Sequence, residues 1–371
     1  MTPPSSLIAA RDRLKAWLVR DALPLWWEAG ADRGDGGFFD TLDLQGRAIA
    51  GVKRARVQAR QIVCYAMAGE LGCAEPWREA MRHGWSFIAS RHRRDDGLYI
   101  AFGGSAAGGS ADLYDQAFML LALARLERAG EPGARDAAEA LVALLPRHED
   151  GGFHGLDGAP LASNPNMHLF EAALAWIDAG GDGPWLEIAA GLARLAMTRL
   201  IDPDTGALGE TFEAGWRPPS NPSVQRVEPG HQFEWAWLLM RWCEASGDAS
   251  ALATARRLVD LAEGVGVDRA RGVAINTLDG RLAPVDRAAR LWPQTERLRA
   301  TLLASQLAGD RTLWESADEA AATLCRYLDM PTPGLWRDQM QTDGEFVVEP
   351  VKASSFYHIV GAILELDRAL G

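Results

Sequence analysis

Cysteine is scarce in this sequence and its copies are scattered. The 371 residues include four cysteines, and no two of them form a Cys-x-x-Cys pair. Disulfide frameworks and structural zinc sites need cysteines that are paired or regularly spaced. The sequence therefore indicates neither, and any chemistry must depend on other residue types.

The chain also lacks a basic run, a long apolar run and a signal peptide. Its formal net charge is -12, with 38 Lys and Arg against 50 Asp and Glu. This balance disfavours nucleic acids, anionic membranes and, more mildly, strongly anionic substrates. No apolar stretch is long enough to cross a bilayer, and the start has no basic segment followed by an apolar core. We expect a soluble, cytoplasmic protein without nucleic-acid or membrane partners; the sequence leaves the oligomeric state open and allows a homodimer.

Three common catalytic signatures are missing as well. The sequence has no Walker-type phosphate loop, no dinucleotide fingerprint and no Ser-His-Asp motif. Nothing therefore points to a nucleotide-dependent enzyme or a serine hydrolase, and we expect no cofactor.

What is present is a short turn signal that recurs six times, at intervals of 54 to 66 residues. The clear copies are Asp-Gly-Gly-Phe at 35–38, Asp-Gly-Leu-Tyr at 96–99 and Asp-Gly-Gly-Phe at 150–153. Weaker copies occupy residues 205–208, 271–274 and 333–336. Each contains a glycine, which permits the positive φ that such turns need. A repeat of this length is typical of a fold built from similar supersecondary units.

The stretches between these turns have apolar residues at helical spacing. They predict twelve helices, near residues 5–22, 54–72, 76–91, 111–130, 133–147, 165–180, 184–200, 228–247, 249–264, 290–308, 311–329 and 351–370. Six hairpins can close as an inner and an outer ring of six helices each, or remain an open superhelix. Because no repeat is obviously polar enough to cap an open end, we favour closure. The predicted fold is all-α: an (α/α)6 barrel formed by residues 1–371 as one catalytic domain.

The helix that follows each turn signal has an unusually polar first turn. Three of the seven histidines, His168, His231 and His358, lie in the first two turns of these helices. One polar first turn means little, because helix starts are commonly capped and exposed, and a lone histidine there is more often structural. Six such turns on alternate helices indicate that their N-termini surround one opening. Helix dipoles make such an opening positive, which suits a polyol or an oxyanion.

Two of these histidines begin His-x-x-Glu pairs, His168 with Glu171 and His231 with Glu234. Residues at this spacing share one face of a helix. Such pairs could bind a metal ion together with further carboxylates. Alternatively, each glutamate could fix the imidazole tautomer and raise its basicity. No His-Glu-x-x-His motif or cysteine cluster accompanies the pairs, so we favour the interpretation without a metal.

The remaining polar residues suit proton transfer on a sugar. A neutral imidazole can remove a proton next to a carbonyl if the enediolate is stabilised, and Arg60 could supply that charge. Trp292 and Tyr114 could stack on a sugar face. Candidate ligands for hydroxyl groups are Asn166, Gln294 and Glu296. An inverting glycosidase would instead rely on two carboxylates, which leaves the histidines unexplained; a helical-repeat binding protein without catalysis is a further alternative.

Four segments resemble the N-acylglucosamine 2-epimerase family, whose members include 2-epimerases and mannose isomerases. They are Asn-Pro-Asn-Met-His-Leu-Phe-Glu-Ala at 164–172, Glu-Pro-Gly-His-Gln-Phe-Glu-Trp at 228–235, Leu-Trp-Pro-Gln-Thr-Glu at 291–296 and Tyr-His at 357–358. The resemblance covers essentially the whole chain, and the second segment is its most specific element. It implies an (α/α)6 barrel.

The resemblance also implies roles for individual residues. His231 and His358 are then the acid/base pair, Arg60 stabilises the enediolate, and His168 acts in substrate binding or ring opening. The expected substrate-binding set is His168, Asn166, Glu171, Glu234, Trp292, Gln294, Glu296 and Tyr114, with no metal ligand.

The segment before the last histidine separates the members of the family. Residues 352–357 read Lys-Ala-Ser-Ser-Phe-Tyr, and Ala353 stands where the epimerases have a tryptophan. The chain therefore looks most similar to the mannose isomerase branch. This similarity implies a monosaccharide substrate, with interconversion of D-mannose and D-fructose through a cis-enediolate. The alternative is a 2-epimerase of an aldose or of N-acylglucosamine on the same barrel.

Overall fold

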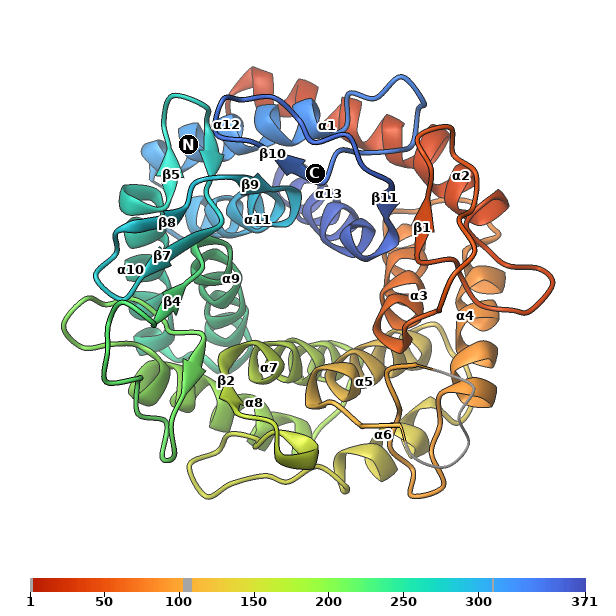
Figure 1. Cartoon of the computed structure of the whole chain (residues 1–371), viewed down its shortest axis with the longest axis horizontal. Coiled ribbons are helices and arrows are strands. Elements are labelled where there is room, and N and C mark those ends of the chain that lie inside the picture. Colours follow the sequence, from red (N-terminus) through yellow and green to blue (C-terminus); the bar gives the residue numbers. More distant parts are fainter. Residues whose placement is uncertain (1–2, 103–108, 309) are drawn as a thin grey trace.

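The computed structural model of the protein describes residues 3–102, 109–308 and 310–371. Its helices form two concentric rings (Figure 1). The inner ring consists of α3 (Ala55–Glu70), α5 (Leu113–Arg128), α7 (Ser163–Asp178), α9 (Pro229–Ser246), α11 (Leu291–Ala308) and α13 (Phe356–Leu370). The outer ring consists of α1 (Ser5–Trp17) with α2 (Leu23–Glu28), then α4 (Trp77–Arg91), α6 (Ala134–Val142), α8 (Pro184–Leu195), α10 (Ala249–Val265) and α12 (Arg311–Tyr327).

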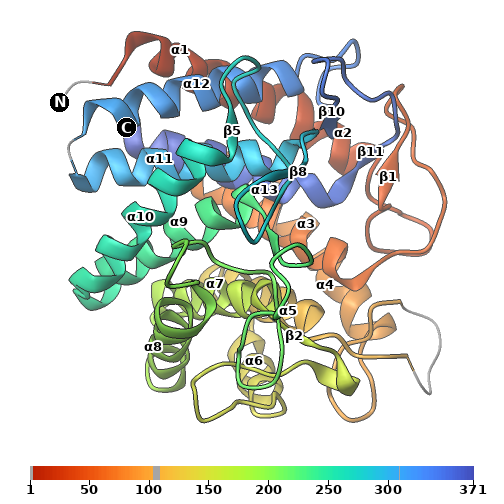
Figure 2. The same ribbon diagram turned by 60° about the vertical axis from the view of Figure 1, so that its left-hand side comes forward.

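The rings are closed, so the open superhelix is excluded. Each inner helix packs against the next one along the chain, and α13 packs against α3. Strands β1 (Thr41–Leu42) and β11 (Val351–Lys352) pair antiparallel across the same junction. In the outer ring α1 packs against α12, and the turned view places both outside α11 and α13 (Figure 2). The prediction of an all-α barrel of helical hairpins is confirmed.

The inner and outer helices differ in how much of their surface is buried. Helix α5 is buried on nearly all sides, whereas α4 buries one face through Ala80, Met81, Gly84 and Ile88. This contrast is expected because the inner ring lies between the outer ring and the central cavity, whereas the outer helices have one face toward solvent. None of the helices in the described parts of the chain is long and apolar enough to cross a membrane.

Short strands lie at the N-terminal ends of the inner helices. Strand β2 (Leu161–Ala162) leads directly into α7, β4 (Arg226–Val227) into α9 and β9 (Ala289–Arg290) into α11. Their partners are β3 (Thr211–Phe212), β7 (Thr277–Asp279) with β8 (Pro284–Asp286), and β10 (Gln339–Met340), while β5 (Val267–Asp268) pairs with β6 (Val273–Ala274). The pairs gather at one end of the barrel (Figure 1). They fix the loops that rise around the opening at that end.

The six turn signals are six equivalent turns. Their glycines all have positive φ, between 71° and 94°. These glycines are Gly36, Gly97, Gly151, Gly206, Gly272 and Gly334. The three weak copies in the sequence are therefore as real as the three clear ones.

A carboxamide from the next inner helix holds five of these turns. The Gln58 side chain accepts a hydrogen bond from the Phe38 N–H at 2.6 Å and donates one to the Phe38 C=O at 2.9 Å. The same pair of hydrogen bonds joins each of these turns to one side chain of a set that we call the turn amides: Gln58, Gln116, Asn166, Gln232 and Gln294. In the sixth repeat Phe356 replaces the amide, and its ring stacks on Trp336 of the turn at 5.3 Å. Buried backbone groups thereby gain partners whose loss is costly.

Each of the twelve predicted helices has a counterpart in the described residues, and the main differences lie at their ends. The first predicted helix continues through a π-helical turn at Leu18–Ala22 into α2. Pro24 is tolerated there because it lies in the first turn of α2, where its missing N–H needs no partner. Helix α6 ends at Val142 rather than near residue 147. The last inner helix begins at Phe356 rather than near residue 351, because Val351 and Lys352 pair with β1.

Candidate active site

The first turns of the inner helices surround a cavity of about 340 Å³. This volume is within the range of small-molecule sites in proteins. The lining residues come from all six inner helices and from the segments that precede them: Arg60, Tyr114, Asn164, His168, Glu228, His231, Glu234, Arg290, Trp292, Asp338, Lys352, Ser354, Ser355 and His358. The structure thus brings the three histidines singled out in the sequence to one cavity.

A common register explains the convergence. Arg60, His168 and Glu234 each follow a turn amide by two positions, and His358 follows Phe356 by the same distance. Because each of these anchors is fixed to its turn, the residues after them are directed alike, toward the axis of the barrel. All four line the cavity.

His231 is held by a carboxylate from outside the helices. Its Nδ1 lies 2.7 Å from Oε2 of Glu210, which comes just before β3. Glu210 also accepts the Glu228 N–H at the start of α9. Burial disfavours the charged imidazole, but the Glu210 carboxylate outweighs it and raises the pKa of His231 to about 9. His231 is therefore an imidazolium near neutral pH.

His358 is held by a carboxylate whose charge is shared. Its Nδ1 lies 2.8 Å from Oε1 of Glu296, and Nη1 of Arg299 lies 2.8 Å from Oε2 of the same glutamate. Burial lowers the pKa of His358, and the hydrogen bond to Glu296 compensates for this only in part. His358 is therefore neutral near pH 7, with the Nδ1 proton directed to Glu296 and Nε2 available as a base.

Both imidazoles lie close to the indole of Trp292. Their ring centroids are 4.9 Å (His231) and 5.7 Å (His358) from that of the indole. The histidines can therefore be no further apart than these two distances combined. Both can contact one monosaccharide that rests against the indole face.

The third histidine, His168, lies in surroundings that strongly desolvate its imidazole. Its Nδ1 lies 3.1 Å from Oε2 of Glu171, and Tyr357 donates its hydroxyl proton to the same carboxylate. The ring packs against Phe118 at 4.4 Å and Tyr114 at 5.0 Å. Burial lowers the pKa of His168 to about 4 despite Glu171. This histidine is neutral, and its Nε2 has no hydrogen-bond partner among the described residues and can act as an acceptor.

Arg60 is a buried cation without a carboxylate partner among the described residues. Its guanidinium donates to the Tyr114 hydroxyl and weakly to the Ser354 C=O at 3.4 Å, and lies 4.4 Å above the Phe118 ring. A buried charge normally needs a counter-charge. Arg60 is therefore available to stabilise a negative charge that develops on a bound molecule.

The other arginine and the lysine that line the cavity are already paired. Arg290 donates to Glu228 at 2.7 Å, and Lys352 contacts Asp338 at 3.1 Å and Glu349 at 3.0 Å. They form a neutral rim rather than an open anion site.

Glu234 has no hydrogen-bond partner among the described residues, although it is only 2% exposed and lines the cavity. Burial and the nearby carboxylates of Glu296 and Glu171 raise its pKa well above the usual range. These surroundings favour the protonated form of Glu234.

Two of the predicted substrate ligands have a different role. Asn166 and Gln294 are turn amides, and their oxygens and nitrogens are bonded to Phe153, Ala162, Ala274 and Arg290 backbone groups. Neither lines the cavity. An amide in a first turn can bind backbone as well as substrate, and here the turn takes it. We correct these two assignments.

Two predicted substrate ligands lie behind the histidines instead. Glu171 and Glu296 are buried and bind Nδ1 of His168 and His358. The expected pairing of His168 with Glu171 is present, but His231 pairs with Glu210 rather than with Glu234. Trp292, Tyr114 and Glu234 do line the cavity.

Glu210 and Arg299 were not found from the sequence. Glu210 lies in a loop, 21 residues before its histidine, where no helical spacing applies. Arg299 follows Glu296 by three positions on α11, and this i, i+3 spacing of opposite charges was a usable signal.

Two groups of side chains in the cavity wall could offer three donor atoms to a metal ion. They are His168, Glu171 and Glu234, and Glu234, Glu296 and His358. In each group the histidine Nδ1 is directed to a carboxylate, and Tyr357 or Arg299 donates to the same carboxylate. Metal ligation would displace these donors. The contacts favour hydrogen-bonded positioning, and the expectation of a metal-free site stays a prediction.

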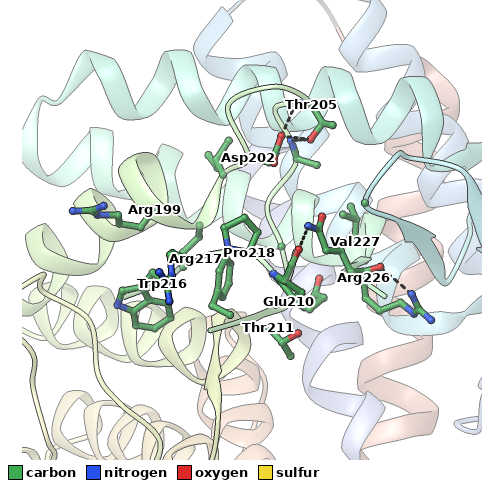
Figure 3. Close-up of a pocket in the computed structure, with 18 of the residues that line it drawn as sticks. Arg199, Asp202, Thr205, Glu210, Thr211, Trp216, Arg217, Pro218, Arg226 and Val227 are labelled. Carbon is green, nitrogen blue, oxygen red and sulfur yellow. Dashed lines mark hydrogen bonds between the residues drawn. The ribbon is translucent and has the colours of Figure 1, made fainter. Parts of the chain in front are cut away.

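A second cavity, of about 230 Å³, lies behind Glu210. Figure 3 shows Arg199 and Arg226 extending to opposite sides of it, so these two cations do not converge on one point. Trp216, Pro218 and Val227 line much of the remainder. No histidine lines it, and we therefore place the chemistry in the first cavity.

Comparisons with known proteins identify the family of the chain. Residues 37–362 match the N-acylglucosamine 2-epimerase (GlcNAc 2-epimerase) family. The chain is 42% identical to a mannose-6-phosphate isomerase of Rhizobium meliloti, over 96% of both chains, and 31% identical to a D-mannose isomerase of Thermobifida fusca, over 63% of this chain and 66% of that one. A crystal structure of D-mannose isomerase superposes with a TM-score of 0.88 at 21% identity, over 98% and 97% of the two chains. The chain thus belongs to the N-acylglucosamine 2-epimerase family and is a sugar isomerase or epimerase, as its sequence predicts.

Proposed function

We propose that the enzyme interconverts D-mannose and D-fructose by proton transfer between C2 and C1. The observation that supports this most is the pair of imidazoles in one cavity, one charged beside Glu210 and one neutral beside Glu296. An aldose–ketose conversion needs a proton donor and a proton acceptor at neutral pH, and the charged and the neutral imidazole can serve as these.

In the first step, Nε2 of His358 removes the C2 proton of the open-chain aldose. The negative charge moves to O1, where the unpaired guanidinium of Arg60 stabilises it. The His231 imidazolium gives its proton to O1, which yields an enediol. No other proton donor or acceptor is required at this stage.

In the second step, His231 takes the O2 proton and the protonated His358 returns its proton to C1. The product is the ketose, and both histidines regain their starting states. Because His358 both takes and returns the carbon-bound proton, part of it is expected to stay in the product rather than exchange with water.

A 2-epimerase is the alternative, and the family itself includes this activity. It would return the proton to C2 from the opposite face, and His231, which lines the same cavity as His358, is the candidate residue for that step. Ala353, which has no side chain able to cover the sugar, favours the isomerase.

The sugar is proposed to be unphosphorylated. A phosphate needs free cations, whereas Arg290 and Lys352 are each paired with a carboxylate. The name of the 42% identical relative makes mannose 6-phosphate the second candidate.

Product analysis tests these alternatives directly. The protein is incubated in deuterated water with D-mannose, mannose 6-phosphate or N-acetylmannosamine, and products are identified by NMR. We expect fructose from D-mannose, with deuterium at C1 in part of the product. Glucose without fructose would contradict the isomerase and support the epimerase, and fructose 6-phosphate as the strongly preferred product would contradict the free sugar.

A further inference from the structure

We infer that the protein binds a divalent transition-metal ion of the zinc class at its surface, between His148, Asp150 and His154 of the third turn. Each of these side chains offers one donor atom, and the three atoms lie within 4.8 Å of one another. None of the three lines the sugar cavity. The inference therefore goes beyond the proposed function and does not depend on it.

The backbone of the turn brings the two histidines together. Arg147 and Phe153 pair antiparallel on either side of the turn. Side chains alternate along such a pair, so His148 and His154, each one position further along, project to the face opposite the buried Phe153. Their imidazole rings stack, with centroids 4.2 Å apart and 15° between the ring planes. Two nitrogen ligands are thus already side by side.

Asp150 supplies the third ligand from the tip of the turn. Its Oδ2 lies 3.0 Å from Nδ1 of His148. Two ligands bonded at about 2.0 to 2.1 Å to one tetrahedral zinc ion lie about 3.3 Å apart. A metal ion can therefore replace the proton between these two atoms after a small movement, and His148 stays neutral with its proton on Nε2.

The Asp150 carboxylate is also held by donors from behind. Trp216 donates its Nε1 proton to Oδ2 at 2.7 Å, and the Gly152 N–H donates to Oδ1 at 2.9 Å. Hydrogen bonds of this kind orient the carboxylate ligands of metal sites. Because a carboxylate oxygen has two lone pairs, Oδ2 can bind an ion and keep the indole proton.

The charges around this turn differ from those in the wall of the sugar cavity. There Arg299 is already the cation beside Glu296 and Glu171, at 2.8 and 3.8 Å. At Asp150 no lysine or arginine of the described residues forms a hydrogen bond or an ion pair. The His148 side chain is 49% exposed, so a hydrated ion can approach and keep water as its further ligands. Two imidazoles with one carboxylate suit zinc-like ions better than magnesium.

The other five turns show that the fold does not require these histidines. His148 and His154 stand three positions before and three positions after the turn glycine. The corresponding pairs in the other repeats contain no histidine: Arg33 and Phe39, Arg94 and Ile100, Pro203 and Gly209, Arg269 and Ile275, and Pro331 and Arg337. The shape of the turn therefore does not explain the pair, whereas a ligand would.

A bound ion would join two loops through Trp216. This residue lines the second cavity (Figure 3), and its ring lies edge-on to His154 at 6.3 Å. Its φ of 60° is uncommon for a bulky residue, so its side-chain contacts must hold it there. An ion on Asp150 fixes the acceptor of the indole proton. We therefore expect the ion to steady residues 213–217 without taking part in catalysis.

Calorimetry measures the binding. Protein dialysed against a strong chelator is titrated with Zn²⁺ at pH 7.5, and we expect one ion per chain with a dissociation constant in the micromolar range. Trp216→Phe, which removes only the donor to Asp150, should weaken binding about 10-fold. His148→Gln and His154→Gln each remove a ligand and should weaken it further. Thermal melting of each variant checks that it is folded.

The matched control removes the competing groups in the sugar cavity. Glu234 belongs to both of them, so Glu234→Gln should keep the full affinity for Zn²⁺. In NMR spectra of histidine-labelled protein, Zn²⁺ should shift the resonances of His148 and His154 and leave His168 and His358 unchanged. Mg²⁺, which prefers oxygen ligands, should shift none of them. Amide hydrogen exchange in residues 213–217 should slow when Zn²⁺ is bound.

Three results would overturn the inference. The first is a wild type that binds no Zn²⁺ in the micromolar range. The second is full affinity in folded His148→Gln and His154→Gln variants, which would make the ion adventitious. The third is loss of binding in Glu234→Gln, which would place the ion in the sugar cavity.

Discussion

His231 and His358 show how one residue type is adjusted in two ways within one cavity. Both lie at the start of an inner helix, both are buried, and both direct Nδ1 to a glutamate. Glu210 comes from a loop and has no cation beside it among the described residues, so its charge acts mainly on His231. Glu296 comes from a neighbouring helix and divides its charge between His358 and Arg299.

The comparison teaches that the counter-charge, more than the hydrogen bond, sets the protonation state. The Nδ1 to carboxylate distances are 2.7 and 2.8 Å, almost the same. Yet the pKa of His231 is raised to about 9, whereas that of His358 is lowered below its ordinary value. In each case burial acts against the charged form, and what differs is whether an undivided carboxylate outweighs it.

Replacing His358, the neutral histidine of the pair, should have the largest effect on activity. We expect His358→Asn to lower kcat for D-mannose by about 10³-fold or more, because the variant lacks the proposed base for the C2 proton. Binding of the sugar, measured by calorimetry, should change little. A variant that fails to fold would show that His358 is structural, and one with near-normal kcat would contradict its role as the base.

Removing the carboxylate that makes His231 different should have a smaller and pH-dependent effect. Activity should fall at low pH as His358 gains a proton, and at high pH as His231 loses its proton through a pKa of about 9. In Glu210→Gln burial is no longer outweighed, so the pKa of His231 should fall to about 6.5 or lower, and the rate should drop by about 30-fold or more at pH 8 and by less at pH 6. The measurement is kcat/KM against pH; an unchanged alkaline limb would refute the role of Glu210.

The turn amides sharpen the comparison, because they lie in the same first turns but should not contribute to catalysis. Gln294→Ala leaves the Ala274 backbone groups buried without partners and should cost about 2 to 4 kcal/mol of unfolding free energy. At temperatures where the variant is folded, KM should stay near that of the wild type. Gln341→Ala, at an exposed position, is the control. A large rise in KM without loss of stability would restore Gln294 as a substrate ligand.

Chelation should have the smallest effect. A metal ion bound by Glu234, Glu296 and His358 would compete with the base for its proton and remove the difference between the two histidines. We expect activity to be unchanged after prolonged dialysis against a strong chelator. Loss of activity that zinc, manganese or cobalt restores would contradict the proposed mechanism.

Much of the fold could be predicted because short-range sequence patterns determine its turns and helices. Glycine positions such as Gly97 and Gly272 mark turns, and apolar spacing marks helices, whatever the rest of the chain does. Closure of the ring was the harder step. It depends on contacts such as β1 with β11, which join residues far apart in the sequence.

The site was predictable only in part, for a physical reason. The histidines and Arg60 could be found because they are unusual in helices that are otherwise apolar. Asn166 and Gln294 were misassigned because a carboxamide binds backbone and sugar hydroxyls equally well. Their recurrence in the same register as Gln58, Gln116 and Gln232 was the signal that separates the two uses. The pairing of His231 with Glu210 had no such signal, since a loop supplies the carboxylate.

The central claim is that the two imidazoles have opposite protonation states at neutral pH, and NMR titration of histidine-labelled protein tests it most directly. Resonances are assigned with His231→Asn and His358→Asn. We predict that His231 titrates near pH 9 and that His358 titrates below its ordinary value, so that only His231 is charged at pH 7. Equal titration of both histidines near pH 6.5, or a charged His358 beside a neutral His231, would contradict the account.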